Sequence, residues 1–165
     1  MRLRWTRANR VKWPLAAAVA AAAFSLDWVA KAVVRDTMAV GERHGLLPFL
    51  YFERTVNQGV AFGLFSGRVS IILLANLLAL GVVVVYLLME TRPVIAGVAG
   101  GLLIGGSLGN IMERLLRDGR VTDFLKIPHY PNFNLADVFI DTGAVLVAVS
   151  LILAWRRGRP ARADG

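Results

Sequence analysis

Two aspartates, Asp123 and Asp137, flank a short polar segment between the last two apolar runs of the chain. A carboxylate at the edge of a lipid bilayer is costly to place, so a pair of carboxylates beside one loop indicates a chemical role. Two carboxyl groups held close together cannot both ionise easily and therefore share a proton. One can then act as general base on a water molecule while the other, protonated, polarises a carbonyl group. This is the chemistry of an aspartic protease, and because such a pair titrates as a unit, base and acid stay unassigned at this point.

Further polar residues are spaced to reach the same place. Asn110 and Arg114 lie four residues apart in the third apolar run. Asn134, Asp137 and Asp141 follow one another at spacings of three and four residues, which share one helix face. An arginine at the outer interface can hold the carboxylates in place and offset part of their repulsion.

Each aspartate also has a purely structural explanation. Asp137 would be favourable against the dipole at a helix N-terminus, and Asp123 would be an ordinary turn residue in a solvated loop. The presence of Asn110, Arg114 and Asn134 at the same expected depth favours a functional site over both explanations.

The elements that must position these residues are membrane spans. Of the 165 residues, 56% are apolar and 18% are charged, and the mean hydropathy is +0.58, unlike an ordinary soluble domain. An apolar run crosses a hydrocarbon core when it has roughly 20 helical residues. We expect one membrane-embedded domain, residues 1–165, with spans at residues 14–34, 69–89, 94–116 and 136–155 and outer segments at residues 35–68 and 117–135.

The distribution of positive charge predicts the orientation of the spans. Basic residues crowd both tails, with Arg2, Arg4, Arg7, Arg10 and Lys12 before the first span and Arg156, Arg157, Arg159 and Arg162 after the last. Both termini are therefore expected in the cytoplasm, and both aspartates near the extracytoplasmic face. The net charge of +8 mostly reflects this bias, with a secondary attraction to anionic membrane lipids. Nucleic acid is not an expected partner, because the basic residues flank spans and form no aromatic-interleaved patch.

Residues 35–68 form the larger outer segment. Residues 46–56 partly alternate between polar and apolar types and predict a strand, while glycines and Pro48 mark turns. The segment is too small for a core of its own. We expect it to cover the mouth of the helix bundle at the membrane surface, with the apolar residues around Phe62 dipping toward lipid.

The third run carries a stripe of glycines at four-residue spacing, Gly97, Gly101, Gly105 and Gly109. This spacing puts bare backbone along one helix face and lets a neighbouring helix approach closely. The stripe therefore predicts helix packing in preference to a ligand site.

A serine protease is the nearest enzymatic alternative. Residues 105–109 match G-x-S-x-G, the nucleophile elbow of serine hydrolases, with Ser107 as the nucleophile. The elbow needs a strand-to-helix turn, whereas this match lies inside an apolar run. The only histidines, His44 and His129, are expected in outer loops, and a pairing of Ser107 with Lys31 would sit at the wrong depth.

Other classes fit less well. Two distant histidines and no cysteine offer no zinc-ligand spacing, so neither a metal nor another cofactor is expected. A proton or ion carrier should place its ionisable groups near the midplane and show an internal repeat, whereas the acids here cluster in the outer third. The first run could be a cleaved signal peptide, but Asp27 and Lys31 follow it without a small-residue cleavage site, which favours an uncleaved helix.

Several motifs together resemble the lipoprotein signal peptidase (signal peptidase II) family. In chain order they are Asp27 with Lys31, residues 57–62 (Asn-Gln-Gly-Val-Ala-Phe), residues 105–110 running to Glu113 and Arg114, residues 119–124, and residues 133–137. Each motif alone is weak. Their order and the spans between them make the resemblance specific over roughly residues 14–155.

The resemblance implies a bacterial inner-membrane aspartyl endopeptidase that removes the signal peptide of a prolipoprotein just before a diacylglyceryl-modified cysteine. It implies a catalytic pair, Asp123 and Asp137, and a substrate-binding set, Asn57, Asn110, Arg114 and Asn134. Supporting positions would be Asp27, Lys31, Gly59, Phe62, Gly109, Glu113 and Asp141.

The fold that the resemblance implies is all-α, with four transmembrane helices, a small extracytoplasmic β-cradle and a surface helix. Part of residues 121–133 would complete the sheet. Substrate would enter laterally from the bilayer, because its signal helix and acyl chains are both lipid-bound. A monomer is expected.

Three residues depart from the family's usual pattern. Glu113 stands where the family usually has Asp, and Ser107 stands where an apolar residue is frequent. Asp141 stands where the family usually has an uncharged residue. This third carboxyl could perturb the catalytic pair or form an ion pair with Lys31, Arg114 or Glu113, and these possibilities stay open.

Overall fold

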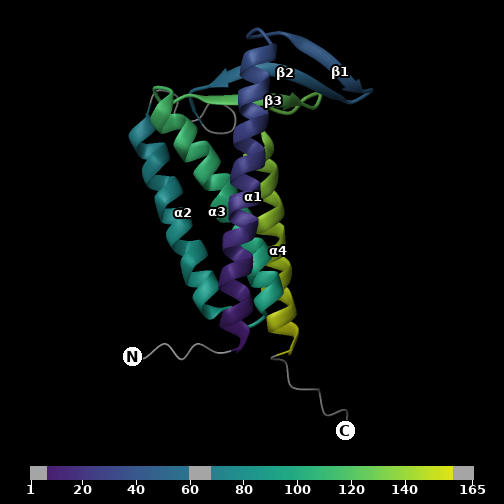
Figure 1. The fold of residues 1–165 in the computed structure, drawn as a ribbon. Coiled ribbons are helices and arrows are strands. Elements are labelled where there is room, and N and C mark those ends of the chain that lie inside the picture. Colours follow the sequence, from purple (N-terminus) through teal and green to yellow (C-terminus); the bar gives the residue numbers. More distant parts are fainter. Residues whose placement is uncertain (1–6, 60–67, 158–165) are drawn as a thin grey trace.

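Four long helices and a small sheet make up the computed structural model, which describes residues 7–59 and 68–157 (Figure 1). The elements in chain order are α1 (Arg7–Thr37), β1 (Arg43–Leu47), β2 (Leu50–Asn57), α2 (Val69–Met89), α3 (Pro93–Leu116), β3 (Val121–Lys126) and α4 (Leu135–Arg157). All four helices are long and apolar enough to cross a membrane. The expected surface helix and Phe62 lie outside the described residues.

The helix bounds follow the expected spans, with one clear difference. The second span was expected at residues 69–89, and α2 has these bounds. The first was expected to begin at residue 14, whereas α1 begins at Arg7 and contains Pro14 in its interior. Hydropathy detects only the apolar part of a helix, and 31 residues extend about 46 Å at 1.5 Å per residue, longer than the hydrocarbon core.

α3 is the central helix and packs against α1, α4 and α2. Its glycine stripe makes these approaches possible, as the spacing predicted. A Cβ added to Gly101 would lie 2.7 Å from the carbonyl oxygen of Ala16, and one added to Gly105 would lie 2.5 Å from that of Ala20. Both distances are too short for real atoms, so backbone-to-backbone packing of α3 on α1 depends on these glycines.

The three strands form an antiparallel sheet of order β1-β2-β3 across one end of the bundle (Figure 1). Residues 46–56 were expected in strand, with a turn at Pro48. The chain turns at Pro48 and Phe49, so this segment is divided between β1 and β2, which pair with each other. His44 was expected in a loop and lies in β1. β3 completes the sheet as expected and places Asp123 opposite Thr55.

At the opposite end, the turn between α2 and α3 is fastened to α4. Glu90 forms an ion pair of 2.9 Å with Arg92, and the hydroxyl of the fully buried Ser150 donates to Glu90 at 2.6 Å. Arg92 also donates to the carbonyl oxygen of Ser150. The hydrogen bonds from Arg92 lower the pKa of Glu90 to about 2. The first residues of α1 and the last of α4 lie at this same end (Figure 1).

Candidate active site

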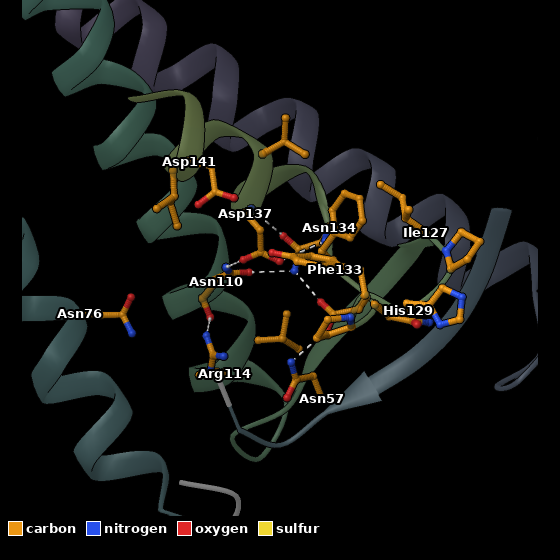
Figure 2. Close-up of a pocket in the computed structure, with 18 residues that line it drawn as sticks. Asn57, Asn76, Asn110, Arg114, Ile127, His129, Phe133, Asn134, Asp137 and Asp141 are labelled. Atoms are coloured by element: carbon orange, nitrogen blue, oxygen red, sulfur yellow. Dashed lines mark hydrogen bonds between the residues drawn. The ribbon is translucent and has the colours of Figure 1, made fainter. Parts of the chain in front are cut away.

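A pocket of about 660 Å³ opens where β3 and the loop after it meet the helices α3 and α4 (Figure 2). Of the expected catalytic and substrate-binding residues, all six contribute to its lining: Asn57, Asn110, Arg114, Asp123, Asn134 and Asp137. They come from β2, α3, β3 and the start of α4, so the fold joins segments that are up to 80 positions apart in the sequence.

Asp123 reaches the pocket from the middle of β3 and is only 2% exposed. One carboxyl oxygen accepts a hydrogen bond of 2.7 Å from Asn134 Nδ2, and the other accepts one of 2.9 Å from Asn57 Nδ2. Burial, reinforced by the nearby charge of Asp137, raises the pKa of Asp123 to about 7, despite these two donors. A carboxyl group in this state can hold a proton near neutral pH.

Asp137 lies in the first turn of α4 and is held by a reciprocal cap. Its backbone N–H donates to Asn134 Oδ1 at 3.1 Å, and one of its carboxyl oxygens accepts from the backbone N–H of Asn134, also at 3.1 Å. This is a capping box, with Asn and Asp in place of the usual Ser or Thr and Glu. The helix-terminal and the functional explanation of Asp137 are thus compatible, because the other carboxyl oxygen faces the pocket residues.

Two amide side chains connect the carboxyl groups. Asn110 Nδ2 donates to the second oxygen of Asp137 at 2.9 Å, and Asn134 Nδ2 donates to both Asp123 and Asn110 Oδ1. Figure 2 shows Asn110, Asn134 and Asp137 side by side in the pocket with the hydrogen bonds between them. The bond from Asn134 to Asp123 completes the connection between the two aspartates. Since every member bonds to the next, the two carboxyl groups are held in a fixed relation within one pocket.

Lys31 and Asp27, both fully buried in α1, stabilise this chain of hydrogen bonds from the side of α1. Lys31 Nζ donates to Asn110 Oδ1 at 2.7 Å and forms an ion pair of 2.8 Å with Asp27. The other oxygen of Asp27 accepts from the backbone N–H of Ala136, at the start of α4. A Cβ on Gly109 would lie 2.5 Å from the Asp27 carboxylate, so only glycine leaves room for it.

Glu113 is fully buried and fastens β3 to the bundle. It accepts from the backbone N–H and the hydroxyl of Thr122, at 3.0 and 2.7 Å, and from Arg35 at 2.7 Å. Thr122 immediately precedes Asp123, so these bonds set the position of that aspartate. Sequence reasoning missed Thr122 and Arg35, because nothing in their local pattern points to a partner on another element.

Arg114 does not contact the carboxylates as the sequence led us to expect. Within the described part of the chain it forms no ion pair, and its guanidinium donates to the backbone carbonyl oxygens of Gly59, at 2.9 Å, and Asn110, at 3.3 Å. Gly59 N–H in turn donates to Asn57 Oδ1 at 2.8 Å, which leaves Asn57 Nδ2 for Asp123. Arg114 therefore holds the backbone after β2 against the pocket.

The remaining polar residues differ in whether they line the pocket. Ser107 lies inside α3, well before its end, and is not among the described residues that line the pocket. Asp141 lines the pocket but makes no hydrogen bond or ion pair with another described residue, so the pairings considered for it are not formed. Asn76 and His129 also line the pocket and were missed, although Asn76 is the only strongly polar residue of its span.

Comparison with known proteins agrees with this geometry. The family model described as signal peptidase (SPase) II matches residues 19–153. A lipoprotein signal peptidase of Staphylococcus carnosus is 37% identical over 140 residues, covering 81% of this chain and 87% of the relative. One of Mesorhizobium japonicum is 35% identical over 151 residues, covering 88% and 89%, and one of Brucella ovis is 38% identical over 141 residues, covering 81% and 87%.

A solved structure also has this fold. It is described as a bacterial membrane enzyme and superposes with a TM-score of 0.83 at 25% identity, covering 92% of this chain and 96% of that protein. Fold, motif order and sequence similarity thus agree over nearly the whole described chain, and the chain belongs to the signal peptidase II family.

Proposed function

We propose that this chain is an aspartyl endopeptidase that removes the signal peptide from diacylglyceryl-modified prolipoproteins, cutting just before the lipidated cysteine. The observation that carries the proposal is the chain of amide hydrogen bonds that joins Asp123 and Asp137 in one pocket. Membership in the signal peptidase II family supports the substrate class.

The two carboxyl groups have different environments, which supports different roles. Asp123 is the more buried member, and its pKa of about 7 makes it the partner that carries the shared proton. Asp137 then takes a proton from water, and the water oxygen bonds to the carbonyl carbon before the cysteine. Asp123 gives its proton to the carbonyl oxygen. When the C–N bond breaks, the proton held by Asp137 goes to the leaving amine, and Asp123 takes a proton back from one hydroxyl of the tetrahedral intermediate as the new carboxyl group forms.

The positively charged residues beside the helix ends support an orientation in the bacterial inner membrane. Arg10 and Lys12 at the start of α1, Arg92 between α2 and α3, and Arg156 at the end of α4 all belong to the end of the bundle opposite the sheet. Positive residues favour the cytoplasmic side, so the sheet and the pocket would face the exterior.

The decisive experiment uses the purified full chain in lipid with a synthetic diacylglyceryl-modified prolipoprotein peptide and no added metal. Asp123→Asn and Asp137→Asn should each lower kcat by at least about 10³-fold, because each removes one half of the acid–base pair. Ser107→Ala is the matched control, since it alters a buried side chain of α3 that does not line the pocket. Near-normal turnover of either aspartate variant, or loss of turnover in the serine variant, would refute the aspartyl mechanism.

A further inference from the structure

β2 contains a β-bulge beside the proposed catalytic pair. Two of its residues, Glu53 and Arg54, lie opposite the single residue Phe124 of β3. The next pair along the ladder is Thr55 opposite Asp123. A bulge adds one residue to one strand only, so it changes which side chains of that strand point to each face of the sheet.

The bulge decides the face from which Asn57 projects. Residues directly opposite each other in a sheet share a face, and successive residues of a strand alternate between faces. Beyond the bulge, Asn57 lies opposite Val121 and therefore shares the face of Asp123, to which its side chain donates at 2.9 Å. If β2 kept the register that it has before the bulge, Val56 would lie opposite Val121 and Asn57 would project from the other face.

The backbone groups of the bulge are paired by segments other than β3. An extra residue in a strand leaves groups without a partner in the ladder, which is costly unless they bond elsewhere. The backbone N–H of Arg54 donates to the carbonyl oxygen of Glu42 at 3.1 Å, and that of Gly41 donates to the carbonyl oxygen of Arg54 at 2.8 Å. The carbonyl oxygen of Glu53 accepts from Asn132 Nδ2 at 3.1 Å.

The side chain of Arg54 fastens the bulge to the outer end of α1, which reaches the sheet (Figure 1). Its guanidinium donates to the backbone carbonyl oxygen of Arg35, at 3.0 Å, and to that of Met38. Carbonyl groups at the C-terminal end of a helix lack partners within the helix, and a positive charge there is favourable against the helix dipole. Arg54 therefore satisfies the end of α1 and holds one residue of the bulge at the same time.

We propose that Arg54 is a positioning residue, which maintains the β2 register that brings Asn57 to Asp123 by fastening the bulge to α1. This inference rests on the proposed function, because Asn57 matters here as a partner of the catalytic pair. Arg54 is not among the described residues that line the pocket, so its effect on the reaction passes through Asn57.

The kinetic test is Arg54→Met, which replaces the guanidinium by an unbranched apolar side chain without donors. In the full chain in lipid, kcat for a diacylglyceryl-modified peptide should fall by about 10-fold to 100-fold with little change in KM, because a displaced partner of the catalytic pair costs rate of this order. Arg54→Lys should regain part of kcat, since an ammonium group can also donate to carbonyl groups at a helix end. The control is Arg43→Met, which removes an exposed arginine of the same hairpin that contacts the side chains of Tyr51 and Glu53.

The register is tested by cross-linking, which does not depend on activity. The chain has no cysteine, so Val56→Cys with Thr122→Cys places a single pair of thiols directly opposite each other. The backbone N–H of Thr122 donates to Glu113, so this is a non-hydrogen-bonded pair, whose short Cα separation suits a disulfide. Mild oxidation should cross-link this pair. Adding Arg54→Met should remove most of the cross-link and favour that of Val56→Cys with Val121→Cys.

The outcomes separate the two proposals. An unchanged kcat in Arg54→Met, measured well below its thermal midpoint, would overturn the positioning role, and so would an unchanged cross-link. Absence of the Val56–Thr122 cross-link in the otherwise wild-type chain would contradict the register itself. If the wild-type chain cleaves no lipid-modified peptide, the proposed function fails, and the cross-link still shows whether Arg54 maintains the register.

Discussion

At the scale of single residues, the site depends on which way one amide points. Lys31 donates to the oxygen of the Asn110 side chain, and only the NH₂ group then remains to face Asp137. The ammonium group of a fully buried lysine is therefore a positioning device for a residue that the carboxylate touches. Asp27 compensates the lysine charge and, through Ala136, also holds the start of α4.

Lys31→Met tests this positioning role. It leaves Asp27 buried without its ion-pair partner, which typically costs about 3–5 kcal/mol, and it frees the Asn110 amide to rotate. We expect a lower thermal midpoint in detergent and a lower kcat with little change in KM. The double variant Asp27→Asn with Lys31→Met should regain part of the midpoint but not kcat. An unchanged kcat in the single variant would mean that Asn110 keeps its orientation without Lys31.

The pKa of Asp123 predicts how stability and activity change with pH. Its folded value of about 7 lies above 3.8, the ordinary value for an aspartate, so near neutral pH the folded chain binds a proton that the unfolded chain releases. This contribution to stability is fully present below about pH 4 and is lost as pH rises through about 7. The thermal midpoint should fall between about pH 5 and pH 8, and kcat should fall as Asp123 loses its proton.

Asp123→Asn should remove most of this change in the thermal midpoint, because an amide does not titrate. The comparison is made with Asp36→Asn, which alters an exposed carboxyl group near the end of α1 and should keep the wild-type dependence. Equal slopes for Asp123→Asn and the wild type would place the titration on another group.

At the scale of elements, the glycines of α3 decide how close the helices come. Gly101 and Gly105 let the backbone of α3 rest on that of α1, which carries Asp27 and Lys31. The residues that support the proposed catalytic pair thus reach it only because the helices pack backbone to backbone. A wider spacing would separate Lys31 from Asn110.

Gly105→Ala should destabilise the protein by about 1–3 kcal/mol, since the new Cβ would lie 2.5 Å from a backbone oxygen that has little room to move. Gly81→Ala in α2 is the control, because a Cβ there meets nothing within 4 Å. Thermal midpoints in the same detergent provide the comparison. Equal midpoints for the two variants would show that α3 can shift away from α1 at no cost.

At the scale of the whole molecule, the two ends of the helix bundle differ in structure and in charge. The sheet covers one end of the bundle (Figure 1). Arg7, Arg10, Lys12, Arg92 and Arg156 belong to the other end. The proposed orientation puts the pocket at the outer leaflet, where the acylated end of a substrate would lie.

Because the chain contains no cysteine, single introduced cysteines report this orientation directly. Arg43→Cys, in the exposed strand β1, should react with a membrane-impermeant maleimide on intact spheroplasts. Arg7→Cys, exposed at the start of α1, should react only after the membrane is opened. The reverse labelling pattern would invert the proposed topology.

Much of the architecture was predictable from local patterns. Residues 69–89 form α2 as expected, and the glycine stripe of α3 packs as its spacing indicated. Residues 46–56 were expected in strand with a turn at Pro48, and they lie in β1 and β2 on either side of that turn. The pairing of the two strands was missed, because alternation within one segment does not show which strands pair. The additional length of α1 was also missed, since its polar first turns have no hydropathy signal.

The chain order of its motifs and the hydropathy of its spans determined the membrane class, the family and the candidate residues of the proposed site, because these are properties of residue types and their spacing. Only the tertiary structure decided which groups touch. In the structure Arg114 donates to backbone carbonyl oxygens instead of carboxylates, and Lys31 orients the amide of Asn110. Asp141 lines the pocket and makes no hydrogen bond or ion pair with another described residue. Such partners lie on different elements, and their choice depends on distances of a few tenths of an ångström that arise from packing.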